Sequence, residues 1–122
     1  MNSMPDFARL GSTLVVTIHD VQLRDTETVQ QLKDAILAEL KEGSVQNVVV
    51  DAAAVEFVGS VGFLAFLAIR RQRTVDRIFL CNLHENVREV FALCRLLATA
   101  NYLEAPFLEA KSVAEALKQL NG

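Results

Sequence analysis

The spacing of apolar residues along the chain changes between the period of a strand and the period of a helix. Two strand-like segments, 7–10 and 13–18, flank the turn signal Gly11-Ser12 and together predict a β-hairpin. From residue 26 to residue 42, apolar residues recur three or four positions apart, as on the buried face of an amphipathic helix. Asp25 is a favourable N-cap for this helix.

The second part of the chain alternates short apolar runs with helical segments. Runs at 47–50 and 77–81 predict strands, and the unbroken valines of the first run favour a central strand covered on both faces. Residues 105–108 predict a last, edge strand, because Pro106 cannot donate to a sheet ladder. Three further helices are predicted: 63–73, opened by residues 59–62; 84–99; and a closing helix through 120 after the capping box 112–115. This alternation, with its antiparallel hairpin, predicts an α/β fold with a mixed sheet.

The composition indicates one globular domain over residues 1–122, with 1–6 as a loose N-terminal tail. Hydrophobic residues make up 52% of the chain and charged residues 22%, which is enough to build a core without disulfides or metals. The N-terminus lacks the basic and apolar regions of a leader peptide. The longest apolar run, 61–69, is shorter than the roughly 20 residues that span a bilayer. We therefore expect a soluble cytoplasmic protein that does not bind membranes.

Charge and cysteine spacing exclude several classes of function. The net charge of -3 has the wrong sign for nucleic-acid binding. Cys81 and Cys94 lack metal or redox spacing, and their apolar neighbours predict free, buried thiols in a reducing compartment. The basic residues Arg70, Arg71, Arg73 and Arg77 are interpreted as complementing a helix C-terminus rather than binding an anion.

The pattern of polar residues does not indicate catalysis, a metal site or a bound cofactor. His19 ends a strand, and His84 is interpreted as a polar cap at a helix start. A Ser-His-Asp triad can be assembled on paper, as it can in any small α/β domain. A strand followed by the turn 59–62 has the layout of a phosphate loop, yet both glycine-rich phosphate motifs are absent. We therefore expect a protein that is not an enzyme.

Residues 48–62 read Val-Val-Val-Asp-Ala-Ala-Ala-Val-Glu-Phe-Val-Gly-Ser-Val-Gly. This segment resembles the signature of STAS domains, the fold of bacterial anti-sigma factor antagonists. That signature is an apolar strand ending in Asp, a short loop, a hydrophobic pair, and Asp-Ser-Ser/Thr-Gly opening a helix. Asp51, Phe57, Val58, Ser60 and Gly62 take the matching positions. The resemblance extends over residues 13–120 and implies a mixed sheet of four to five strands with about four helices packed on it.

The resemblance implies a switch in which a kinase phosphorylates Ser60. The chain would capture an anti-sigma factor that is also a serine kinase, and phosphorylation would release it; ATP would belong to the kinase. Gly59 and Gln22 replace two family acids that lie beside the phosphorylation site, and Val61 replaces a hydroxyl residue, which bears on kinase recognition. The residues expected to contact the partner are Gln22, Asp51, Gly59, Ser60, Val61, Gly62 and Phe63.

The position of Ser60 has its own physical interpretation. A serine just before a helix is a favourable N-cap, and the same helix end would tolerate a phosphate. Two other functions stay open at this point: a STAS scaffold without a phosphoswitch, and a small ligand-binding domain. We expect a monomer or a weak homodimer, and a helix at 63–69 that is buried on most sides.

Overall fold

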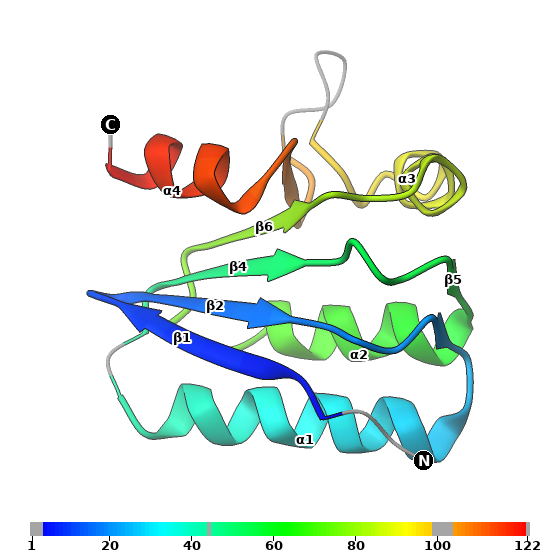
Figure 1. Ribbon diagram of the computed structural model, residues 1–122, viewed down its shortest axis with the longest axis horizontal. Helices are drawn as coiled ribbons and strands as arrows, with labels where there is room; N and C mark the ends of the chain where they lie inside the picture. Colours follow the sequence, from blue (N-terminus) through cyan, green and yellow to red (C-terminus); the bar gives the residue numbers. More distant parts are fainter. Residues whose placement is uncertain (1–3, 44, 99–103, 122) are drawn as a thin grey trace.

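The main β-sheet has five strands in the computed structural model, which describes residues 4–43, 45–98 and 104–121. In spatial order they are β1 (Asp6–Leu10), β2 (Thr13–Thr17), β4 (Asn47–Asp51), β6 (Arg77–Cys81) and β7 (Leu108–Ala110). β1 is antiparallel to β2, and the other three neighbouring pairs are parallel (Figure 1). The predicted hairpin and the predicted mixed sheet are therefore confirmed.

Helices cover both faces of this sheet. Over the described residues they are α1 (Thr26–Lys41), α2 (Ser60–Arg70), α3 (Glu85–Leu93) and α4 (Val113–Asn121). α1 and α2 run side by side (Figure 1) and share one core with α3 and with Leu14 and Val16 of β2. Val15 lies between those two residues, so it points to the opposite face, where α4 packs through Ala116. Among the described residues, no helix is both long and apolar enough to cross a membrane.

The first long helix follows its sequence pattern closely. The Asp25 carboxylate accepts a hydrogen bond from the Thr28 backbone N–H at 2.9 Å. Asp25 is therefore the N-cap, as predicted. This bond favours the ionised carboxylate and lowers the pKa of Asp25. The buried residues of α1 are those of the predicted stripe, Val29, Leu32, Ile36 and Leu40.

A second, two-stranded sheet was not predicted. β3 (Gln22–Leu23) and β5 (Phe57–Val58) pair in parallel, with Gln22 opposite Phe57 and Leu23 opposite Val58. A strand of two residues is too short to show an alternation of apolar and polar positions, so the sequence pattern could not indicate either strand. This small sheet joins the start of α1 to the start of α2.

Several predicted boundaries differ from the structure. α2 covers Ser60–Arg70 rather than 63–73, and β7 covers Leu108–Ala110 rather than 105–108. α3 was predicted to reach residue 99, which lies outside the described residues, but the helix ends at Leu93. Arg95 has a φ of 59° there, and its N–H bonds the Ala92 carbonyl while that of Leu96 bonds the Phe91 carbonyl. These two bonds form a Schellman motif, which stops the helix without the usual glycine.

The beginnings of α4 and β1 also bear on sequence predictions. The hydroxyl of Ser112 accepts from the Glu115 backbone N–H at 3.1 Å, as the capping box predicted. Asp6 of the expected tail 1–6 is the first residue of β1, and residues 1–3 lie outside the described residues.

Four phenylalanine rings pack against one another and join α2, α3 and the residue that precedes β7. The ring of Phe91, which is 1% exposed, lies 4.7 Å from the ring centre of Phe63, 5.7 Å from that of Phe66 and 6.0 Å from that of Phe107. Tilted and edge-to-face arrangements of this kind add to the free energy gained by burial. The cluster therefore fixes α3 against the helix that begins at Ser60.

Replacing the central ring of this cluster should reduce stability strongly. We expect Phe91→Ala to lower the free energy of unfolding by about 3–5 kcal/mol, because it leaves a large cavity. Urea denaturation followed by circular dichroism measures the change. Leu93→Ala, two residues later on the same helix and 81% exposed, is the control and should stay within about 0.5 kcal/mol of the wild type. Equal losses for the two variants would contradict this account.

Candidate functional site

Ser60 is the first residue of α2, and its side chain is exposed. The N-cap is Gly59, whose carbonyl accepts the first helical hydrogen bond, from the Phe63 N–H at 3.1 Å. The prediction that Ser60 caps the helix is therefore wrong: α2 begins at Ser60 and not after it, so Ser60 lies inside its first turn. Within the described part of the chain, the Ser60 hydroxyl has no hydrogen-bond partner. It is free to react or to face a partner.

Main-chain hydrogen bonds to β3 hold the start of α2 in place. The Gly59 N–H donates to the Leu23 carbonyl at 2.9 Å. Just before β3, the Val21 carbonyl accepts from the N–H groups of Glu56 and Phe57, at 2.7 and 3.2 Å. These bonds do not depend on any side chain at Ser60, so the serine can change without losing its support.

Gly62 is buried and permits a close approach between α2 and the small sheet. A Cβ on Gly62 would lie 2.7 Å from Val58 Cγ1 and 2.8 Å from the Leu23 carbonyl oxygen. The second atom belongs to the backbone and cannot rotate away, so the position requires glycine. The signature glycine therefore supports the Ser60 surface from the interior and does not lie on it.

Asp51 forms hydrogen bonds with the loop that leads to Ser60 and is not part of the exposed surface around Ser60. One carboxylate oxygen, Oδ1, accepts from the Ala53 N–H at 3.1 Å and from the Asn82 amide at 3.0 Å. Asn82 has a φ of 58°, a backbone conformation that asparagine adopts more readily than most residues. The strand-end acid of the signature thus ties the ends of β4 and β6 together.

The same loop is also bonded to the start of α3. His84 Nε2 donates to the Ala53 carbonyl at 2.7 Å, and the Asn86 amide donates to the Glu56 carbonyl at 2.6 Å. His84 is the N-cap residue of α3 as predicted, but its ring does not cap that helix. Its side chain instead reaches across to the loop before β5.

Exposed apolar side chains surround Ser60. Val21, Phe57 and Leu64 are 48%, 44% and 61% exposed, respectively. Leu64 follows Ser60 by four residues and so lies on the same side of α2. The Phe57 ring lies 3.6 Å from the point where a Cβ on Gly59 would be, and Val21 is bonded to Phe57 through the backbone. We call Ser60 together with Val21, Gln22, Phe57, Gly59, Val61 and Leu64 the Ser60 face.

Two shallow grooves border the Ser60 face. One, of about 190 Å³, separates α2 from α1 and is lined by Val61, Leu64 and Lys33 among others. The other, also about 190 Å³, separates β5 and α2 from α3 and is lined by Phe57, Phe63 and Val90 among others. Each has room for a large apolar side chain from a protein partner, and each is too open and small to enclose a cofactor.

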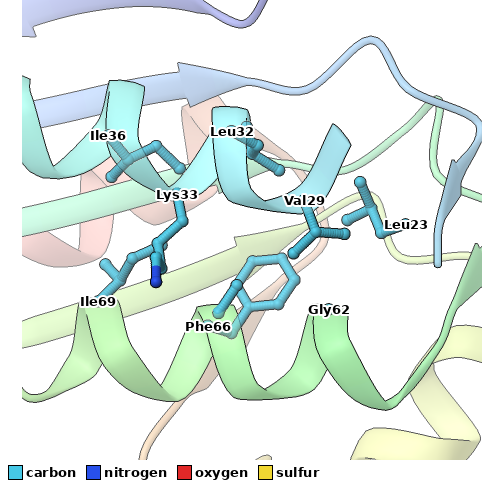
Figure 2. Close-up of a pocket in the computed structure, with 9 residues that line it drawn as sticks. Leu23, Val29, Leu32, Lys33, Ile36, Gly62, Phe66 and Ile69 are labelled. Atoms are coloured by element: carbon cyan, nitrogen blue, oxygen red, sulfur yellow. The ribbon is translucent and has the colours of Figure 1, made fainter. Parts of the chain in front are cut away.

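The space directly beneath the first groove is filled. Figure 2 shows Val29, Leu32 and Ile36 of α1 facing Phe66 and Ile69 of α2, with Leu23 and Gly62 at one end. The volume left between these side chains is about 10 Å³. At most one water molecule fits there, so this is a packed helix interface and not a ligand site.

The sequence and the fold agree on the family. The model of the STAS domain family matches residues 8–105. The chain belongs to the STAS domain family. No match was found among curated protein sequences.

Three solved structures share the STAS fold over nearly the whole chain. SpoIIAA, an anti-sigma factor antagonist in its unphosphorylated form, is 20% identical, with a TM-score of 0.67 over 97% of this chain and 98% of that one. A serine-to-glutamate variant of RsbS from Moorella thermoacetica is 17% identical, with a TM-score of 0.72 over 98% and 96%. A candidate anti-sigma factor antagonist from Thermotoga maritima is 14% identical, with a TM-score of 0.76 over 97% and 95%.

The STAS framework brings together some of the residues expected at the partner surface and separates others. Gln22, Gly59, Ser60 and Val61 lie on the Ser60 face, and Phe63 is half-buried against Phe91. Asp51 and Gly62 lie below that face. Sequence reasoning missed Val21, Phe57 and Leu64 as surface residues, although the spacing of Leu64 from Ser60 indicates their shared side of the helix.

Two polar residues of this STAS domain, His19 and Arg70, have structural partners away from Ser60. His19 Nε2 lies 2.7 Å from Asp6 Oδ2 at the start of the hairpin. Arg70 donates to the carbonyls of Val75 and Asp76, at 3.0 and 3.1 Å, and so closes the turn after α2. Both contacts hold local structure, and of the basic cluster it is Arg70 that has the structural role expected.

The two cysteines differ in environment, and one prediction fails. Both are free; Cys81 is buried as predicted, but Cys94 is exposed because α3 ends before it. Burial, with a smaller effect from the Asp51 charge, raises the pKa of the Cys81 thiol to about 12. Since the thiolate is the reactive form, the two thiols should react very differently.

Thiol labelling should separate the two cysteines. In native protein at pH 8, we expect one thiol, Cys94, to react quickly with an aromatic disulfide reagent, and the second to react only after unfolding. Absorbance of the released thiolate measures both phases. Cys94→Ser should abolish the fast phase alone, and a fast phase that survives in this variant would contradict the assignment.

The close contact at Gly62 gives a second prediction. Alanine favours helix over glycine by about 1 kcal/mol in an unobstructed position. We expect Gly62→Ala instead to lower the free energy of unfolding by about 1–3 kcal/mol, because the added methyl group overlaps Leu23 and Val58. Urea denaturation shows whether the substitution lowers or raises the free energy of unfolding. Ser60→Ala is the nearby control and should leave that free energy almost unchanged. A stabilised Gly62→Ala variant would refute the close approach.

Proposed function

We propose that this STAS domain is a cytoplasmic anti-sigma factor antagonist without catalytic activity of its own. It would bind an anti-sigma factor that is also a serine kinase, and so free the sigma factor for transcription. The observation that carries this proposal is the exposed, unbonded hydroxyl of Ser60 at the head of α2, surrounded by exposed apolar side chains. The fold shared with the anti-sigma factor antagonist SpoIIAA supports it.

The Ser60 face has the properties of a docking surface for a protein. Its exposed apolar residues, Val21, Phe57 and Leu64, would leave water when a partner binds. Burial of apolar surface contributes roughly 25 cal/mol per Å², and the two bordering grooves give partner side chains places to insert. Exposed apolar groups gathered in one place are typical of interaction sites.

Phosphorylation would act on binding rather than on folding. The kinase would transfer the γ-phosphoryl group of its ATP to Ser60 Oγ, with loss of the hydroxyl proton and release of ADP. The phosphate carries about -1.5 to -2 charges at neutral pH. At the first turn of α2 it meets free N–H groups and the positive end of the helix dipole, so the domain stays folded. Buried unpaired in an apolar contact, however, the same charge costs several kcal/mol.

A second candidate function rests on the residues that replace the family acids. Gly59 and Gln22 are neutral, and both lie on the Ser60 face. If the partner kinase requires those acids, the chain would act as a STAS scaffold that joins other regulators without a phosphoswitch. A large stable assembly, with unmodified Ser60 in cells, would favour this scaffold.

The proposed switch predicts different effects of two substitutions at Ser60. The partner would first be recovered by affinity purification from the native cell, with mass spectrometry of the partner and of Ser60. We then expect Ser60→Ala to bind with nearly wild-type affinity and Ser60→Asp at least about tenfold more weakly, a loss of about 1.4 kcal/mol. Isothermal titration calorimetry measures both affinities.

The matched control is Ser12→Asp, which adds the same charge in the exposed hairpin turn between β1 and β2. It should bind normally, and all three variants should melt within about 2–3 °C of the wild type, since surface substitutions change stability little. Equal partner affinity for the wild type, Ser60→Ala and Ser60→Asp would reject the phosphoswitch.

A further inference from the structure

Arg24 lies beside the residue that precedes Ser60. It follows β3 directly, and its Cβ and Cα are 3.2 and 3.5 Å from the point where a Cβ on Gly59 would be. The hydrogen bond from the Gly59 N–H to the Leu23 carbonyl holds these two segments together. The backbone of Arg24 is therefore fixed next to the start of α2, whatever the side chain does.

The Arg24 side chain is exposed and has no bonded partner among the described residues. Three other arginines are already engaged: Arg9 with Glu39, Arg70 with two backbone carbonyls, and Arg88 with Glu109. The guanidinium of Arg24 is thus available, and the fold keeps the backbone of Arg24 close to Ser60, which has the only hydroxyl on the Ser60 face.

The backbone geometry brings Ser60 within reach of this side chain. The distance from Arg24 Cα to Ser60 Cα cannot exceed about 9 Å, given the 3.5 Å contact at Gly59, one Cα–Cβ bond and one peptide unit of 3.8 Å. An extended arginine and a phosphoserine together span that separation. Arginine also matches phosphate in geometry, since its planar fork donates two parallel hydrogen bonds.

We propose that Arg24 binds the phosphate of phosphorylated Ser60 and folds it back onto the Ser60 face. This inference rests on the proposed function only in assuming that Ser60 is phosphorylated. The phosphate then lies between the α2 N-terminus and the Arg24 guanidinium, over the apolar residues that a partner would contact. Arg24 is a positioning residue of the switched-off state, and it makes no contribution to folding before Ser60 is modified.

The charged groups nearby leave Arg24 free for this role. Asp25 and Glu27 are at the start of α1, and Glu56 precedes β5. The Asp25 carboxylate already accepts the Thr28 N–H, and among the described residues no ion pair joins Arg24 to Asp25, Glu27 or Glu56. Gln22 and Gly59 carry no charge, so no acid at these two positions competes with the phosphate for the guanidinium.

The test installs phosphoserine at position 60 of the full chain by genetic code expansion and follows the phosphate by ³¹P NMR during a pH titration. A neighbouring cation favours the dianion and so lowers the second pKa of the phosphate below its usual value of about 6. We expect Arg24→Gln to raise the titration midpoint by about 0.5 pH units or more, and the difference to shrink at high salt. The α2 N-terminus is present in both proteins, so the comparison isolates Arg24.

Two further variants complete the test. Arg24→Lys keeps the charge and should restore a large part of the lowered midpoint. Arg73→Gln removes an exposed arginine beyond the opposite end of α2 and should leave the midpoint unchanged. Circular dichroism shows that each variant is folded, and unmodified Arg24→Gln should melt like the wild type.

Equal midpoints in the wild type and Arg24→Gln would overturn the assignment, and so would an equal rise in Arg73→Gln. The titration uses an installed phosphate and no partner, so its failure leaves the proposed antagonist function standing. Conversely, equal partner affinity of the Ser60 variants would reject the switch while leaving the Arg24 contact intact.

Discussion

The close approach of the first turn of α2 to the small β3–β5 sheet is the constraint on which the site depends. There is no space for a side chain at Gly62, where an added Cβ would lie 2.8 Å from a backbone oxygen of Leu23. This contact fixes where α2 begins, and the bond from Gly59 to Leu23 fixes its direction. Ser60 is then held at the surface by the backbone alone, with its own side chain uncommitted.

This arrangement separates the stability of the domain from the properties of its surface. The residues that hold the site, Gly62, Asp51 and the Phe91 cluster, are buried or bonded below the Ser60 face. The residues that a partner would meet, Phe57 and Leu64 among them, are exposed and contribute little to the core. A change at Ser60 should therefore have almost no effect on folding, which is what a reversible modification requires of its site.

The sequence predicted those features that have a period or a local signal. Such a signal exists for the hairpin, the apolar stripe of α1, the central strand β4 and the Asp25 cap. The structure confirms all four. The failures occur where tertiary contacts decide. β3 and β5 are two residues long and exist only as a pair, and Cys94 is exposed because Arg95 takes a positive φ without being glycine. α2 begins at Ser60 and not after it, because Gly59 is bonded to β3. In the candidate site, Ser60 was found by its resemblance to a motif, but its exposed apolar surroundings depend on packing that no local pattern records.

The charge beside Ser60 determines how a phosphate there would act. In the family pattern that this chain resembles, acids occupy the positions of Gly59 and Gln22, and their like charge would repel a nearby phosphate. Here both positions are neutral and Arg24 is adjacent, so the local field attracts the phosphate instead. A phosphate drawn back onto the Ser60 face covers Phe57 and Leu64 and also brings a negative charge beside them. Loss of binding then has two causes, the cost of desolvating the anion and the loss of apolar contact area. The second depends on the contact between Arg24 and the phosphate, so it weakens as salt screens that contact.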